Sequence, residues 1–156
     1  MQVFFNSILG AILVSSGLWA NQISEVQTTA APKIVGPYSQ AVRAGQYLFV
    51  SGQLGVDPNT GKLLGNTIEE QTRQALNNVE AILQSAGLSL KHVVRADVYL
   101  KDMNDVQGMN AVYAERFSQA IKPARTSLQV ASLPHGGLVE ITCIAFIITQ
   151  EVYPFN

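Results

Sequence analysis

Two charged residues stand in otherwise apolar stretches near the C-terminal end of the sequence. Arg125 enters one predicted strand, and Glu140 stands between Val139 and Ile141 in the next. A charge that leaves water at such a position is costly unless an opposite charge or a ligand meets it. A guanidinium is a rigid two-pronged donor that fits a carboxylate, and a glutamate can exchange a proton with water. An ordinary ion pair between Arg125 and Glu140 would also satisfy both charges, so a structural and a functional role are both open.

Other reactive side chains form no recognisable catalytic pattern. The one cysteine, Cys143, lies within the last predicted strand, where a buried and inert thiol is expected. His92 and His135 occur in loop-like contexts with no acid or nucleophile nearby in the sequence. The sequence also has no Gly-x-Ser-x-Gly elbow, no glycine-rich phosphate loop and no His/Glu metal motif. We therefore expect no metal site.

Length and composition point to one small domain. The chain has 156 residues, of which 47% are hydrophobic and only 13% charged, and its formal net charge is −1. This apolar content exceeds what a single small domain would bury, which indicates a targeting segment, a subunit interface, or both. Lys and Arg form no cluster. Nucleic acid is therefore not expected as a main partner, because phosphate neutralisation needs a basic patch.

The hydrophobic pattern predicts the order strand, strand, helix, strand, helix, strand, strand. The first two strands form a hairpin whose turn contains Gly45. Thr67 and Glu70 have the spacing of a capping box at the start of the first helix. The later elements are predicted at 67–86 (helix), 93–100 (strand), 102 or 104 to 117 (helix), 124–131 (strand) and 138–149 (strand).

The last predicted strand is apolar at nearly every position. A strand of this kind is usually covered on both faces of its sheet. Two helices can cover only one face, so a neighbouring subunit is expected on the other.

The N-terminal part of the chain has a different character from the rest. Residues 1–20 are uncharged and largely apolar and close with Leu18-Trp19-Ala20, which favours a cleaved secretory signal and no stable membrane span in the mature protein. The stretch lacks Lys and Arg, so an uncleaved anchor or an extension of a cytosolic protein is also open. The protein is expected to be periplasmic or secreted if the signal is cleaved, and cytoplasmic otherwise. Residues 21–33 are predicted to be a linker, followed by one domain over residues 34–156.

Several motifs between Thr28 and Ile148 occur in an order that resembles the Rid (YjgF) family of enamine/imine deaminases. The resemblance rests on four segments and on two helical motifs that lie between them. They are Ile34-Val35-Gly36-Pro37-Tyr38-Ser39-Gln40-Ala41, Val50-Ser51-Gly52-Gln53, Pro123-Ala124-Arg125 and Val139-Glu140-Ile141, with Gln74-x-x-x-Asn78 and Asn110-Ala111-x-Tyr113.

The resemblance implies a fold and an assembly. The fold would be a single α+β domain of the chorismate-mutase-like type, with a mixed sheet and two helices on one face. Three copies would form a homotrimer with an active site at each subunit cleft, which would cover the second face of the sheet.

The resemblance also implies an activity without a cofactor. Arg125 would hold the carboxylate of a 2-imino acid such as 2-iminobutanoate or 2-iminopropanoate, and Glu140 would position or activate the attacking water. The products would be a 2-keto acid and ammonia. Some members carry cysteine where this chain has Ser127, and the N-terminal extension is unusual for the family. The residues expected to line or support the pocket are Tyr38, Ser51, Gly52, Asn110 and Ser127.

Two other functions are open at this point. Some relatives are credited with endoribonuclease activity, against which the acidic pI near 6.1 and the absent basic patch both count. A protein that binds small carboxylates without catalysis would need Arg125 but not Glu140.

Overall fold

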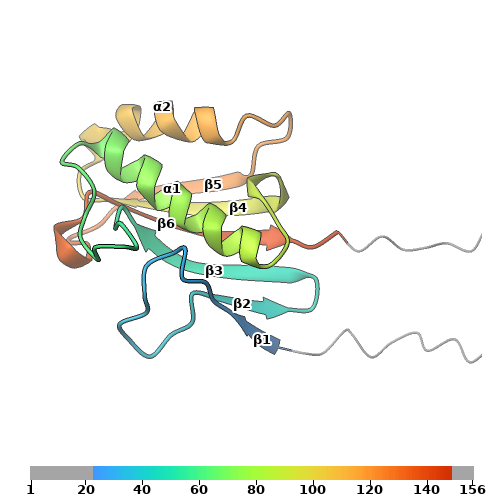
Figure 1. Ribbon diagram of the computed structural model, residues 1–156. Helices are drawn as coiled ribbons and strands as arrows, with labels where there is room; N and C mark the ends of the chain where they lie inside the picture. The colour runs from blue at the N-terminus through green and yellow to red at the C-terminus, as the bar shows by residue number, and fades with distance from the viewer. Residues whose placement is uncertain (1–22, 149–156) are drawn as a thin grey trace, which may run out of the picture.

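The computed structural model describes residues 23–148, so the predicted signal at residues 1–20 lies outside the described part of the chain. These residues form two layers, a six-stranded sheet and a pair of helices packed on one of its faces (Figure 1). None of the helices within residues 23–148 is long and apolar enough to cross a bilayer.

The sheet is mixed, as expected for the α+β class. Its spatial order is β1-β2-β3-β6-β4-β5, and only β4 and β5 run parallel to each other. The strands are β1 (Ile23–Val26), β2 (Ala41–Ala44), β3 (Tyr47–Leu54), β4 (Val93–Leu100), β5 (Ala124–Gln129) and β6 (Val139–Phe146). β6, the last strand within residues 23–148, therefore pairs in the middle of the sheet, and β5 forms one edge.

The helices follow local signals in the sequence. In α1 (Ile68–Ser85), Thr67 accepts a hydrogen bond from the Glu70 backbone and Glu70 accepts one from Thr67, so the predicted capping box is confirmed. The second helix, α2 (Val106–Arg116), begins later than predicted. Asp102 instead caps a short 3₁₀ turn, η2 (Met103–Asp105), that leads into it. Two further 3₁₀ turns are η1 (Leu90–His92) and η3 (Pro134–Gly136).

The core lies between the helices and one face of the sheet. Along β6 every second residue is buried, from Val139 to Ala145, and these side chains pack beneath the helices. The intervening residues of β6, from Glu140 to Phe146, point to the opposite face and are only half-buried. We call this second face, which neither helix covers, the open face. The prediction that the helices cover only one side of the sheet is confirmed.

One prediction for the N-terminal region is wrong. Residues 21–33 were expected to be a linker, but Ile23–Val26 is a strand that pairs antiparallel with β2. The loop after β1 is also held in place, because the buried Gln40 amide accepts from Thr28 N at 2.6 Å and donates to Pro32 O at 2.8 Å. An edge strand with mostly exposed side chains lacks the alternation of apolar residues by which strands are recognised.

Candidate functional site

Arg125 lies on the helix side of the edge strand β5. It pairs in register with the buried Ala96 of β4, and its side chain reaches α2. The guanidinium carbon Cζ is 4.6 Å from the centre of the Tyr113 ring, and Nη1 is 3.9 Å from Met109 Sδ. None of the ion pairs within residues 23–148 includes Arg125. The positive charge therefore stands at the edge of the sheet with only neutral side chains beside it.

The periodicity of α2 explains why these two side chains meet Arg125. Met109 and Tyr113 are four residues apart, so they project from the same face of the helix. Both are buried, and Tyr113 also packs on Phe117 one turn further along, with ring centres 4.4 Å apart. In the sequence Tyr113 stood out only as part of the motif Asn110-Ala111-x-Tyr113, which did not indicate a contact with Arg125.

Two other predicted site residues lie near Arg125 in the fold. Ser127 is two residues further along β5 and so faces the same side of the sheet, and its Oγ is buried without a hydrogen bond to any described residue. Asn110 is half-buried on α2, next to Met109 in the sequence. Within residues 23–148 no hydrogen bond joins Asn110 to Arg125. We call Arg125, Ser127 and Asn110 the Arg125 group.

Glu140 lies on the open face of the sheet. Its neighbours along β6, Val139 and Ile141, are buried beneath the helices, so the Glu140 side chain points the other way. Burial raises the pKa of the Glu140 carboxyl above its ordinary value. Within the described part of the chain the carboxyl makes no ion pair and lies directly over Gly52.

The backbone under Glu140 carries a β-bulge. Val50 pairs with Cys143 and Gln53 pairs with Ile141, so Ser51 and Gly52 both lie opposite one residue of β6. Ser51 is fixed on both sides, because its N donates to Gln40 O at 2.9 Å and its Oγ donates to Ser39 O at 2.6 Å. A side chain at position 52 would overlap the Glu140 carboxyl, which explains glycine there.

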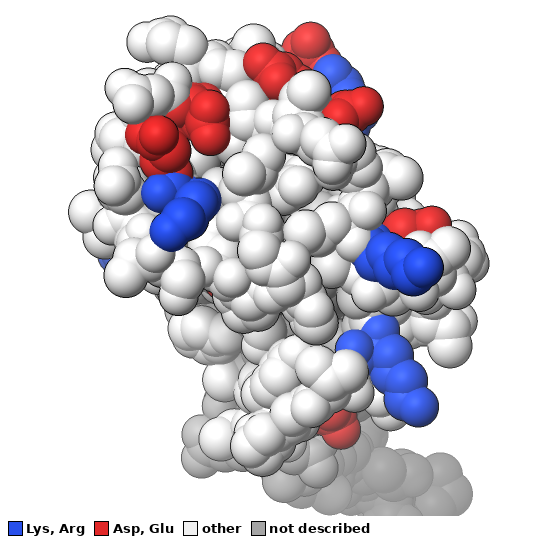
Figure 2. Space-filling model, turned by 90° about the vertical axis from the view of Figure 1, so that its left-hand side faces the viewer, with Lys and Arg blue, Asp and Glu red and all other residues white. Residues whose placement is uncertain are grey.

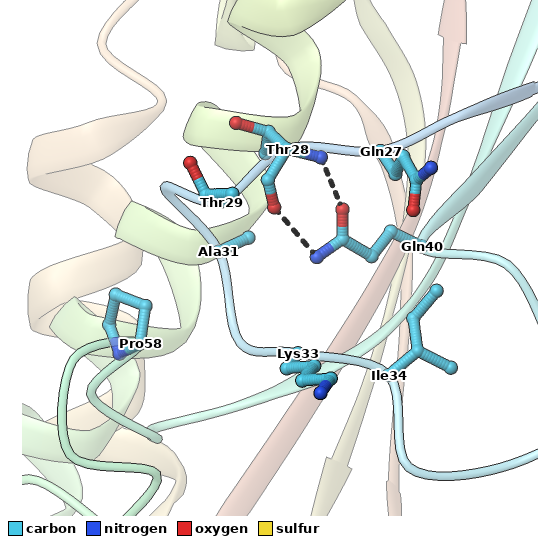
Figure 3. Close-up of a pocket in the computed structure, with 8 residues that line it drawn as sticks. All are labelled: Gln27, Thr28, Thr29, Ala31, Lys33, Ile34, Gln40 and Pro58. Carbon is cyan, nitrogen blue, oxygen red and sulfur yellow. Dashed lines mark hydrogen bonds between the residues drawn. The ribbon is translucent and has the colours of Figure 1, made fainter.

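Tyr38 is brought to the same region by the loop between β1 and β2. Tyr38 and Gly52 line one hollow of about 200 Å³, and the Tyr38 side chain is about half exposed. A second hollow of about 640 Å³ adjoins it and shares Lys33, Gln40 and Pro58 among its lining residues (Figure 3). We call Glu140, Ser51, Gly52 and Tyr38 the Glu140 group.

The structure separates the two groups. Arg125 is on the helix side of β5, Glu140 is on the open face of β6, and β4 lies between these two strands. The interpretation of Arg125 and Glu140 as an ordinary ion pair is therefore wrong within one subunit. Each group presents charged or polar side chains, but neither contains both the cation and the carboxyl.

The single cysteine belongs to neither group. Cys143 lies on β6 beneath the helices, and burial raises the pKa of its thiol to about 12. A thiol of this kind is protonated and a poor nucleophile near neutral pH. Among residues 23–148, no three His, Cys, Asp or Glu side chains come together in a way that could hold a metal ion.

A family model described as endoribonuclease L-PSP matches residues 28–147. The chain belongs to this family, also called Rid or YjgF. The resemblance identified from the sequence motifs is thereby confirmed.

Individual members of the Rid family are similar to the chain over most of their length. A RutC family protein of Pyrococcus horikoshii is 52% identical over 119 residues, which cover 76% of this chain and 94% of that protein. A 2-iminobutanoate/2-iminopropanoate deaminase of Capra hircus is 46% identical over 120 residues, which cover 77% of this chain and 87% of that protein. Among solved structures, that of E. coli TdcF with bound serine superimposes on this chain with a TM-score of 0.76. The two sequences are 39% identical, and the match covers 79% of this chain and 98% of TdcF. The fold predicted from the resemblance is confirmed by this likeness.

Proposed function

We propose that this Rid-family chain hydrolyses 2-imino acids to 2-keto acids and ammonia, in sites that two neighbouring copies build together. One copy would contribute the Arg125 group and its neighbour the Glu140 group, within the homotrimer that the resemblance implies. The observation that carries the proposal is the placement of the two charges. The Arg125 guanidinium and the Glu140 carboxyl lie on opposite faces of one sheet, and neither meets an opposite charge among the described residues.

An apolar patch on the open face supports an assembly of this kind. Tyr47, Phe49 and Phe146 form an aromatic cluster there, with the Tyr47 ring centre 6.3 Å from that of Phe49 and 5.5 Å from that of Phe146. Leu128, on the same face, is 51% exposed. The exposure of these apolar side chains to water is unfavourable, so their burial against a second copy would stabilise the assembly. Because Glu140 lies on this face, such packing would bring its carboxyl to a subunit boundary.

In the proposed reaction Arg125 binds the substrate. An arginine fork donates two parallel hydrogen bonds to a carboxylate, which fixes both the position and the orientation of the imino acid. No carboxylate of the described chain competes for these donors. The substrate would therefore supply the negative charge that the guanidinium lacks.

Glu140 is proposed to act on water. It would take a proton from the water that attacks the imine carbon and pass that proton to the imine nitrogen, giving a carbinolamine. The carbinolamine hydroxyl proton would then move to nitrogen as the C–N bond breaks, which releases ammonia and the keto acid. The raised pKa of Glu140 makes its carboxylate a stronger base than an exposed one. Since an imine is already electrophilic, positioning and proton transfer supply what the step needs.

The relatives support this choice of substrate. The Capra hircus relative is named a deaminase of 2-iminobutanoate and 2-iminopropanoate, and TdcF was crystallised with serine. Both names point to small molecules that carry a carboxylate beside an amino or imino carbon.

A coupled assay tests the proposal. An amino-acid oxidase with catalase would generate 2-iminobutanoate from 2-aminobutanoate, and keto-acid release would be compared with and without the chain. We expect the parent protein to accelerate keto-acid release. With Arg125→Ala the rate should equal that of the spontaneous reaction without protein. If calorimetry shows that the parent protein binds the keto acid but the assay shows no acceleration of imine hydrolysis, the chain would instead be a binding protein.

The same preparations separate the proposal from endoribonuclease activity. The face shown in Figure 2 is mostly uncharged, and its Lys and Arg side chains do not form one continuous patch. We expect no cleavage of single-stranded RNA on a gel at moderate salt. Cleavage that persists in both Arg125→Ala and Glu140→Gln, without imine hydrolysis by the parent, would contradict the proposed function.

A further inference from the structure

The guanidinium of Arg125 rests on neutral side chains. Its Cζ lies 4.6 Å from the centre of the Tyr113 ring, and Nη1 lies 3.9 Å from Met109 Sδ. An arginine side chain has many rotamers, and binding a ligand bidentately requires that one of them be held. Whatever holds Arg125 in one rotamer therefore influences how firmly it binds a carboxylate.

Tyr113 is itself firmly placed. Its side chain is 7% exposed, and its ring packs on Phe117 with the ring centres 4.4 Å apart. Both residues belong to the C-terminal part of α2 and its cap, where the Phe117 backbone N donates to Tyr113 O at 2.9 Å. The ring therefore offers the guanidinium a rigid surface and not a second mobile partner.

We propose that Tyr113 is the positioning residue of Arg125: its ring attracts the guanidinium and holds it at the edge of β5, with N–H donors free for a substrate carboxylate. The inference rests on the proposed function, in which Arg125 binds that carboxylate. The electron-rich face of an aromatic ring attracts a cation. A ring beneath the guanidinium holds it without accepting the in-plane N–H bonds that a carboxylate needs.

A carboxylate in the place of Tyr113 would hold Arg125 just as well but would neutralise it and occupy its donors. Tyr113 avoids both effects. Burial raises the pKa of the Tyr113 phenol to about 12, so the side chain is neutral near neutral pH. The positive charge of Arg125 is therefore kept for the ligand.

A series of fluorinated phenylalanines at position 113 tests the inference. Each added fluorine weakens the negative potential of the ring face while the ring keeps nearly the same shape, so folding is preserved. Calorimetric titration with 2-ketobutyrate would give the dissociation constant. We expect Tyr113→Phe to bind within about three-fold of the parent, because it keeps the ring. From Phe to trifluoro-Phe the dissociation constant should rise stepwise, by between about three- and thirty-fold in total.

The matched control is the same series at Phe117. That residue is buried on the same helix end and touches Tyr113, but it forms no cation–π contact with Arg125. Its fluorination should leave the dissociation constant unchanged. If fluorination at position 113 leaves the dissociation constant unchanged, or if it has equal effects at positions 113 and 117, the inference is overturned while the proposed function stands.

A measurement without ligand completes the test. In the parent and in Tyr113→Phe, the Arg125 Nε–Hε signal, assigned with Arg125→Lys, should show a ring-current shift and restricted motion. In Tyr113→Leu both should be lost. A mobile, unshifted signal in the parent overturns the inference directly. A parent with the restricted signal that binds no 2-ketobutyrate overturns the proposed function, and the inference falls with it.

Discussion

The contact between Gly52 and Glu140 allows activity and stability to be separated by one methyl group. A Cβ at position 52 would overlap Glu140 Oε1 and would lie 2.7 Å from Cδ and 3.0 Å from Cγ of that side chain. Favourable carbon–carbon contacts lie at about 3.5–4.0 Å. In Gly52→Ala the carboxyl carbon must therefore move by roughly 1 Å, and the flexible end of Glu140 can do so without displacing the backbone.

The expected result of Gly52→Ala is a large loss of turnover with little loss of stability. A displacement of about 1 Å at a reacting group can reduce the rate by about 10²-fold, which corresponds to about 2.7 kcal/mol in the activation barrier. We expect kcat for imine hydrolysis to fall by about that factor. The dissociation constant for 2-ketobutyrate should change little, because the Arg125 group is untouched. The coupled assay, calorimetry and a thermal melt measure the three quantities.

Gly137→Ala is the matched control. Its added methyl would also crowd a flexible side-chain end, Leu54 Cδ2 at 2.8 Å, but not the Glu140 carboxyl. It should therefore keep most of the parent activity. If Gly52→Ala turns over imines at the parent rate, or if the control loses as much activity, the position of the Glu140 carboxyl does not limit the reaction.

Three further substitutions give distinct expectations. Arg125→Lys keeps the charge but loses the fork, so kcat/KM should fall roughly ten- to a hundred-fold in the coupled assay, and an unchanged value would exclude bidentate binding. Glu140→Gln should bind 2-ketobutyrate normally with kcat reduced about 10²–10⁴-fold, and parent-like turnover would remove Glu140 from the chemistry. Because burial raises the pKa of Glu140, its contribution to stability is present below its unfolded pKa and is lost as pH rises through the folded pKa. Glu140→Gln should therefore melt above the parent at pH 7 but not at pH 3. Ser127→Cys should change turnover by less than about tenfold, and a larger gain would show that a thiol matters there.

Much of the fold could be predicted because its signals are local. The capping box at Thr67, the helical spacing of apolar residues in α1 and the hairpin turn at Gly45 each involve a few neighbouring residues. The near-continuous apolar run of β6 also predicted an uncovered face correctly, since Phe146 and its neighbours on the open face are only half-buried. What these signals share is that their partners lie close in the sequence.

The strand β1 and the separation of the charges could not be predicted in this way. Ile23 is 77% exposed on an edge strand, so no alternation marks β1. The two-residue period of a strand tells which of its own residues share a face, but the common orientation of residues on two strands depends on their register. Arg125 and Glu140 are on different strands with β4 between them, and only the assembled sheet shows that they face opposite ways. The contact between Tyr113 and Arg125 was not predicted either, because it depends on how α2 packs on β5.

Subunit mixing tests most directly whether each active site draws Arg125 from one copy and Glu140 from its neighbour. Arg125→Ala and Glu140→Gln would be produced separately and then refolded together in equal amounts, with each variant refolded alone as the control. In a ring of copies each site lies between two neighbours, and about one site in four then has both native residues. We predict that each variant alone retains at most about 1% of the parent activity and that the mixture recovers about a quarter of it. If the refolded mixture contains hybrid trimers and is still inactive, both residues must come from the same chain, which would contradict the shared site.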